Sequence, residues 1–218
     1  MRTNLNKEFI DKFKSVKEIK MFWDKVSFIY DFVETVYNKD VYNNTGKMVA
    51  SYIESTDVVL ECACGTGAIS KHIATKCNRL TATDYAKGML RQARKNLKGF
   101  HNISIEQANL MSLEYEDESF DKVVAGNVIH LLQEPDKALK ELERVVKSGG
   151  KIIIPTYINR EKKNSLVAAK VFELFGADFK RQFDMNSYRK FFEQNGYLDV
   201  DYTVVEGKMP CCIAVITK

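Results

Sequence analysis

The sequence has no long apolar run and nowhere approaches the roughly 18 to 20 consecutive apolar residues of a membrane-spanning helix. Its first segment, MRTNLNKEFIDKFKSVKEIK, lacks the apolar core and small-residue cleavage site of a secretory signal peptide. The five cysteines are odd in number and two are adjacent, unlike the framework of a secreted disulfide-rich domain. These absences predict a cytoplasmic protein with reduced thiols and no transmembrane segment.

Proline is also scarce, with three in 218 residues, and no Gly/Ser-rich linker or internal repeat divides the chain. We therefore expect a single domain over residues 1–218. Hydrophobic residues make up 45% and charged residues 28%, which is the balance of a globular protein. A formal net charge of +4 is too small to indicate a dedicated nucleic-acid-binding protein, so we expect no nucleic-acid partner.

Residues 7–37 have the pattern of helices, because apolar residues recur at helical spacing. Lysines lie among these apolar positions, and a basic amphipathic segment can contact a membrane surface peripherally. A helical cap over residues 1–45, packed on the rest of the domain, is the favoured interpretation.

From residue 47 onward, apolar strand patterns alternate with helix patterns. Strands are expected in DVVLECA, RLTATD, ISIEQAN, FDKVVAGNVI and KIIIPTY, the last bounded by Pro155. Helices are expected in GAISKHIATK, in AKGMLRQARKNL, and from Pro135 to the pair Gly149–Gly150. Strands joined by crossover helices form a parallel sheet with helices on both faces. Residues 46–155 are therefore expected to form the parallel part of the sheet.

Residues 156–218 have the pattern of two helical stretches followed by a hairpin. A helical stretch near residues 163–175 precedes a helix in MNSYRKFFEQNGY, which Gly196 closes. LDVDYTVVEG and CCIAVITK then follow in close succession and predict an antiparallel hairpin. The expected fold is α/β: a doubly wound, mostly parallel, Rossmann-like sheet of seven strands with this hairpin and an N-terminal helical cap.

The sequence VVLECACGTGAIS, residues 58–70, follows the first strand with a glycine-containing turn. Open parallel sheets bind ligands beyond the carboxyl ends of their strands. Gly65 and Gly67 have no Cβ and permit a close backbone approach by a ligand. Asp84 ends the second strand, where a carboxylate can accept hydrogen bonds from both hydroxyls of a ribose. The pattern indicates a nucleotide-like ligand.

Other ligands fit this turn less well. A dinucleotide site has the pattern G-x-G-x-x-G, but Ser70 replaces its third glycine, and Glu61 would repel a diphosphate. An acid at that position instead favours a ligand with a positive charge. A P-loop is excluded because no Gly-Lys-Ser/Thr follows. Cys62 and Cys64 should point to one face of the strand, but no matching pair lies nearby to complete a zinc site, so we expect buried thiols and no metal.

Four segments, in order, resemble the class I S-adenosylmethionine-dependent methyltransferases: LECACGTG, TDYAKGMLRQAR, QANLMSLEYEDESFDKVV and ALKELERVVKSGGKIII. The resemblance is strongest to the small-molecule type that includes ubiquinone and menaquinone methylases, and it covers residues 45–155 well. It implies that residues 46–155 are the cofactor-binding half and that residues 156–218 are the substrate-side segment with the C-terminal hairpin. It implies S-adenosyl-L-methionine as cofactor, S-adenosyl-L-homocysteine as product, and methyl transfer to an O, N, C or S atom of a small molecule. The motif N/D-P-P-Y/F, which marks methylation of amino groups on nucleobases or glutamine, is absent.

The same resemblance assigns a set of residues to the cofactor. The first motif, residues 61–67, surrounds the amino-acid portion, Asp84 takes the ribose hydroxyls, and Tyr85 packs on the adenine. Asn127, at the end of the fourth strand, faces the methionine portion and the transferred methyl. The full set is Tyr30, Glu61, Ala63, Cys64, Gly65, Gly67, Asp84, Tyr85, Met89, Asn109, Leu110 and Asn127.

Two of these residues depart from the family pattern. Ala63 stands where the family usually has glycine, and its methyl group fits if φ is negative there. Asn109, next to Leu110, replaces the usual aspartate at the position that contacts the adenine amino group. Its side-chain carbonyl can still accept a hydrogen bond from an adenine N–H.

The sequence says less about the catalytic residues and the methyl acceptor than about the cofactor site. His130 is a candidate general base for a hydroxyl or amine acceptor, with packing of its loop as the alternative. Tyr30 either contacts the cofactor or packs within the cap. A nicotinamide-dependent oxidoreductase and a non-catalytic cofactor-binding module are the alternative functions. A membrane-lipid acceptor is also open, as is the choice between a monomer and a homodimer.

Overall fold

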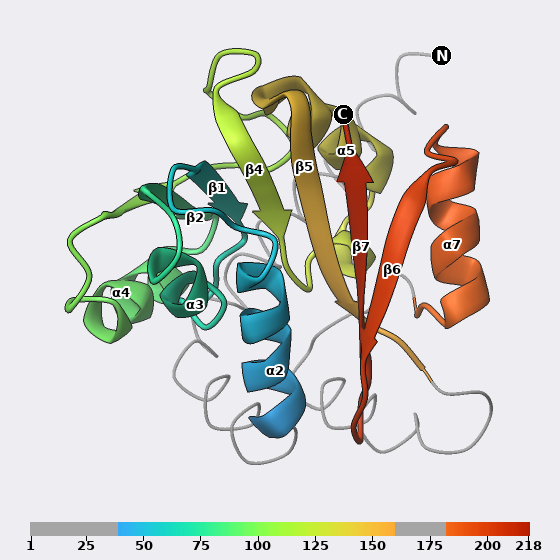
Figure 1. The fold of residues 1–218 in the computed structure, drawn as a ribbon, viewed down its shortest axis with the longest axis horizontal. Helices are drawn as coiled ribbons and strands as arrows, with labels where there is room; N and C mark the ends of the chain where they lie inside the picture. The colour runs from blue at the N-terminus through green and yellow to red at the C-terminus, as the bar shows by residue number, and fades with distance from the viewer. Residues whose placement is uncertain (1–38, 160–181) are drawn as a thin grey trace, which may run out of the picture.

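A computed structural model describes residues 39–159 and 182–218 and shows one mixed sheet covered by helices (Figure 1). The strands are β1 (Val58–Cys62), β2 (Arg79–Asp84), β3 (Ile103–Gln107), β4 (Phe120–Ala125), β5 (Val146–Tyr157), β6 (Val200–Val205) and β7 (Cys211–Thr217). The helices are α2 (Lys39–Ala50), α3 (Ser70–Ala74), α4 (Lys87–Asn96), α5 (Pro135–Val145) and α7 (Met185–Gln194), with a 3₁₀ turn η1 (Ile129–Leu131). The expected helices over residues 7–37 and 163–175, and Tyr30, lie outside the described residues.

The strand order is β3-β2-β1-β4-β5-β7-β6. Strands β1 to β5 are parallel, whereas β7 pairs antiparallel with both β5 and β6. This order confirms the doubly wound α/β sheet and its C-terminal antiparallel hairpin. Because β1 lies between β2 and β4, the turns that follow these three strands meet at one edge of the sheet.

Alternating side chains of the strands build an apolar core on each face of the sheet. On one face, Leu60 and Cys62 pack with residues of α5 and α7. On the other face, Val59 packs with residues of α2, α3 and α4. Burial on both faces explains why Val58, Val59 and Leu60 of β1 are consecutive apolar residues and do not alternate with polar ones. Within the described residues, no helix combines the length and apolarity needed to cross a membrane.

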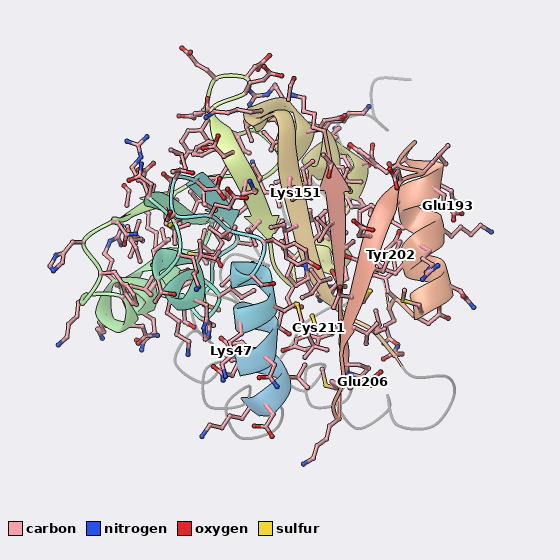
Figure 2. All side chains as sticks on the ribbon, in the orientation of Figure 1. Lys47, Lys151, Glu193, Tyr202, Glu206 and Cys211 are labelled. Carbon is pink, nitrogen blue, oxygen red and sulfur yellow. The ribbon has the colours of Figure 1, made fainter. Side chains whose placement is uncertain are left out.

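Helix α2 runs across residue 47, where the alternating strand and helix pattern begins. Its buried positions, Val41, Thr45 and Val49, are four residues apart and face the sheet. A Cβ on Gly46 would lie 2.3 Å from the His72 side chain, so glycine lets α2 pack closely against α3. Lys47, one residue on, is among the side chains labelled in Figure 2.

Two expected boundaries around β5 are wrong. The helix before it ends at Val145 instead of reaching Gly149–Gly150, and Val146 already pairs with Phe120 of β4. Pro155 does not bound the strand but lies inside β5, opposite Ile213 of β7. Proline supplies no N–H to the sheet there, but its carbonyl oxygen accepts a hydrogen bond from the backbone N–H of Asn127 at 2.8 Å.

Candidate functional site

The turn after β1 lies beside the carboxyl end of β2. Cys62 is paired with Thr83 in the parallel ladder, and the N–H of Cys64 donates to the Thr83 carbonyl at 2.8 Å. Cys62 is also paired with Ala125, the last residue of β4. The sheet therefore brings the glycine turn, Asp84 and the turn at Asn127 to the same edge, as the sequence predicts.

Three residues of the glycine turn have left-handed backbone conformations. The φ angle is +54° at Ala63, +56° at Gly65 and +92° at Gly67. The condition under which the Ala63 methyl would fit without strain, a negative φ, is not met, so an alanine occupies a conformation that favours glycine by roughly 1–2 kcal/mol. Its methyl group is accommodated in a strained turn instead of a relaxed one.

The same backbone reversal corrects the prediction for the cysteines. Cys62 packs in the core with α5, whereas Cys64 packs in the core with α3 and α4, so the two side chains do not share a face. All five cysteines are buried and reduced, including Cys211 at the start of β7 (Figure 2). Burial raises the pKa of Cys62 to about 12, so this thiol is neutral at physiological pH. Among the described residues, no group of three histidines, cysteines or acids has a metal-site arrangement.

The two glycines of the turn have different surroundings. A Cβ on Gly65 would meet no atom of the described residues within 4 Å, so the described part of the chain leaves this position open. A Cβ on Gly67 would lie 2.7 Å from the Leu97 side chain. Asn96 also ties the end of α4 to the turn, because its Nδ2 donates to the Thr66 carbonyl at 2.9 Å. Gly65 is thus available to a ligand, and Gly67 permits the turn to pack against α4.

Asp84 is held by backbone N–H groups on both carboxylate oxygens. Oδ2 accepts from Gly65 at 2.9 Å and Oδ1 accepts from Ala86 at 2.8 Å. Each carboxylate oxygen can accept more than one hydrogen bond, so capacity is left for ligand hydroxyls. The adjacent Tyr85 has 39% of its surface exposed, whereas Met89 is buried in the first turns of α4.

Glu61 is the most buried acid of the site, with 2% of its surface exposed. Its Oε2 accepts a hydrogen bond from the Ser70 hydroxyl at 2.5 Å, and Ser70 is fully buried at the start of α3. Burial raises the pKa of Glu61 to about 8, Ser70 opposes the shift, and the charge of Asp84 adds to it. In the sequence, Ser70 is notable only because it replaces the third glycine of the dinucleotide motif. Its place as the first residue of a helix was the signal that could have indicated a polar contact near Glu61.

Asn109 and Leu110 lie beyond the end of β3. Asn109 is exposed, and its Oδ1 accepts from the backbone N–H of Met111 at 3.1 Å. The Asn109 side chain therefore stabilises the turn from Asn109 to Met111, and its Oδ1 retains one lone pair for a ligand. Leu110 is buried in the core with α5. Of the pair, only Asn109 is exposed at this edge.

Asn127 and His130 follow β4. Asn127 has φ +52°, and its Oδ1 is buried with no hydrogen-bond partner among the described residues. His130 lies on η1 with 7% of its surface exposed, and burial lowers its pKa to about 4. Its imidazole is therefore neutral near pH 7, which is the state that a general base requires.

The comparisons with known proteins agree with this geometry. Residues 60–154 match the family model described as a methyltransferase domain. This match covers a little under half of the chain, which is similar to methyltransferases over these residues. A demethylmenaquinone methyltransferase of Clavibacter sepedonicus is 32% identical over 148 residues, which cover 66% of this chain and 60% of that relative. The methyltransferase-domain match implies S-adenosylmethionine as the cofactor, as the sequence predicts.

Solved structures share the fold at low sequence identity. An S-adenosylmethionine-dependent methyltransferase from Thermotoga maritima superposes with a TM-score of 0.72 and 18% identity, covering 91% of this chain and 99% of that one. The [4+2]-cyclase SpnF superposes with a TM-score of 0.72 and 17% identity, covering 92% and 94%. This chain spans about 60% of the length of the curated relatives it matches.

Proposed function

We propose that this chain transfers the methyl group of S-adenosylmethionine to a nucleophilic O, N, C or S atom of a small molecule. The observation that carries the proposal is the link between the glycine turn and β2, in which Gly65 donates to Asp84. It sets an open backbone position beside a fixed carboxylate at the carboxyl edge of the sheet. The methyltransferase-domain match over residues 60–154 supports the same function.

The residues at this edge fit the cofactor in charge and shape. Glu61 is a buried acid with no cationic partner among the described residues, which suits the ammonium group of a methionine portion. Gly65 has open space where a side chain would be, and Tyr85 offers an exposed ring to a purine. When bound, S-adenosylmethionine supplies an electrophilic methyl group on a sulfonium.

The protein's own part in the reaction is mainly alignment. Asp84 would accept the ribose hydroxyls while its two backbone contacts keep the carboxylate in place. Asn127 would present its buried Oδ1 near the methionine end, and Asn109 would meet the adenine. His130, neutral and buried, would take the proton of a hydroxyl or amine acceptor. Tyr30, outside the described residues, stays a prediction.

A small-molecule acceptor is favoured because matched relatives are named for small-molecule acceptors. One of them is a demethylmenaquinone methyltransferase. A membrane-lipid acceptor is one case within this class. The shared fold of the cyclase SpnF means that cofactor binding and methyl transfer have to be tested separately. We therefore separate the two measurements.

Cofactor binding is tested by titrating the full chain with S-adenosylhomocysteine, and with NAD as the competing ligand, in a calorimeter. We expect binding of the first and none of the second. Methyl transfer is tested by incubating the enzyme with labelled S-adenosylmethionine and a metabolite extract, with and without liposomes. A labelled product that disappears in Asp84→Ala supports the proposal. Binding without a product from any fraction contradicts the enzymatic part.

A further inference from the structure

Glu61 differs from the other buried acid of the described residues because no described cation accompanies it. Asp57, the other buried acid, forms an ion pair with Lys122 at 3.3 Å. Among the described residues, the Glu61 carboxyl has one hydrogen-bond partner, the Ser70 hydroxyl, which donates to Oε2 at 2.5 Å. No described lysine, arginine or histidine forms an ion pair with Glu61. An ionised carboxylate in such surroundings is strongly disfavoured.

The other titratable groups around Glu61 do not compensate for a negative charge. Asp84, on neighbouring β2, has the same sign and raises the Glu61 pKa further. Cys62 and Cys64, which both follow Glu61 in the sequence, have raised pKa values because they are buried, so they are neutral thiols. Val124 of β4, paired with Glu61 across the ladder, carries no charge. A pKa of about 8 leaves the empty-site carboxyl mostly protonated at pH 7.

We propose that Ser70 and Glu61 form a proton-linked receptor for the cationic amino-acid end of the cofactor. In the empty site Glu61 is a neutral carboxylic acid, and on binding its O–H bond breaks and the proton passes to solvent. The carboxylate that remains pairs with the ligand's ammonium group. The inference rests on the proposed cofactor binding and adds a protonation step to it.

Ser70 has a defined part in this step as a positioning residue. Its hydroxyl donates to Oε2 and fixes that oxygen, so the acid's proton belongs on Oε1. A donor to a carboxyl favours the ionised form, so Ser70 also eases loss of the proton when the ligand arrives. Removing the hydroxyl should raise the pKa of Glu61 and shift ligand binding toward higher pH.

The sign of the ligand linkage follows from the two states. Below pH 8 the empty site holds a proton that the occupied site has lost, so raising the pH favours binding. The dissociation constant for S-adenosylhomocysteine should fall by nearly tenfold from pH 6 to pH 7. This ligand keeps its ammonium group throughout that range and has no sulfonium, so it isolates the amino-acid end.

The decisive experiment is calorimetry of the full chain with S-adenosylhomocysteine at pH 7 in buffers of different ionisation enthalpy. We expect release of close to one proton per ligand bound. Glu61→Gln mimics the neutral acid and should release none, with a nearly pH-independent affinity. Ser70→Ala should bind more weakly at pH 7 and recover at higher pH. Ser104→Ala, which removes the same hydroxyl from the exposed Ser104–Glu106 pair, should behave as the wild type.

A second measurement does not use the cofactor. The folded-state pKa of Glu61 lies above the ordinary value of 4.5, so its contribution to stability is complete below pH 4.5 and is lost as pH rises toward 8. Relative to Glu61→Gln, the unfolding constant of the ligand-free wild type should rise up to tenfold per pH unit in this window.

The outcomes separate this inference from the proposed function. Tight binding without proton release, or a stability difference that does not change with pH, overturns the receptor and leaves cofactor binding intact. No binding at any pH, with the stability difference still pH-dependent, overturns the cofactor proposal and the ligand step with it.

Discussion

Gly65 and Asp84 are joined by a hydrogen bond in which the glycine N–H donates to the carboxylate Oδ2 at 2.9 Å. Asp84 therefore fixes the glycine turn, and under the proposed function the same carboxylate would also receive the ribose hydroxyls of the ligand. Its Oδ1 holds the N–H of Ala86, the residue that precedes α4. Changes at Asp84 should accordingly affect both stability and binding.

Asp84→Asn tests this double dependence. One amide position presents N–H groups where the carboxylate accepted hydrogen bonds, so a backbone donor loses its partner. We expect a loss of about 1–3 kcal/mol in the free energy of unfolding and at least tenfold weaker binding of S-adenosylhomocysteine. Urea denaturation and calorimetry measure the two effects. Asp199→Asn, at an exposed acid, is the control and should change neither. Unchanged affinity in Asp84→Asn would remove Asp84 from the site.

The two glycines of the turn should respond differently to alanine. Gly65→Ala places a methyl in open space and adds left-handed strain, so it should cost about 1 kcal/mol in stability. Its effect on cofactor affinity should be large, because the methyl occupies the space beside Asp84.

Gly67→Ala combines left-handed strain with a clash against Leu97, so it should cost about 2–4 kcal/mol in stability. Gly99→Ala meets no atom within 4 Å and serves as control. Denaturation curves and binding isotherms of the three variants suffice. If Gly65→Ala binds like the wild type, the open side of the turn is not the ligand side.

Ala63→Gly should stabilise the protein. Glycine relieves the strain at φ +54°, and this gain is partly offset by the greater freedom of glycine in the unfolded chain. The net expectation is a gain of about 0.5–1 kcal/mol with cofactor affinity within twofold of the wild type. Ala86→Gly, at an ordinary φ of −86°, is the matched control and should destabilise. A loss of stability in Ala63→Gly would show that the methyl contributes packing worth more than the strain.

Much of the sheet could be predicted because apolar runs with polar ends mark its strands. Strand β2 has the bounds that RLTATD suggests, with exposed Arg79 at its start and Asp84 at its end. The end of α5 was harder, because Val146 suits both the helix stripe and a strand. Its pairing with Phe120 decided between them, and a pairing between distant residues is not local information.

In the candidate site, too, some features follow from the sequence and others depend on contacts between distant residues. The edge that gathers Glu61, Gly65 and Asp84 follows from strand order, and strand order follows from crossover rules. The positive φ of Ala63 could not be read from an alanine, and the faces of the two cysteines depended on it. The contact between Ser70 and Glu61 needs a strand and a helix to be placed together.

His130 gives a prediction about acid stability that does not require the methyl acceptor. Its folded-state pKa of about 4 lies below the ordinary value of 6.5, because burial disfavours the imidazolium. The contribution to stability is therefore complete above pH 6.5 and is lost as pH falls toward 4. Relative to His130→Asn, the wild type should lose roughly 2 kcal/mol of unfolding free energy between pH 7.5 and pH 5.

Urea denaturation at these two pH values measures the difference, and His101→Asn, at an exposed histidine, is the control. The same variants test catalysis once an acceptor is known. A general base at His130 predicts a fall in kcat of about 10²–10⁴-fold in His130→Asn, with the dissociation constant for S-adenosylhomocysteine unchanged. It also predicts no inflection from this histidine between pH 6 and pH 7 in the wild-type rate, because its pKa lies near 4. A variant that keeps full kcat but loses the acid-stability difference would assign His130 to packing of the loop after β4.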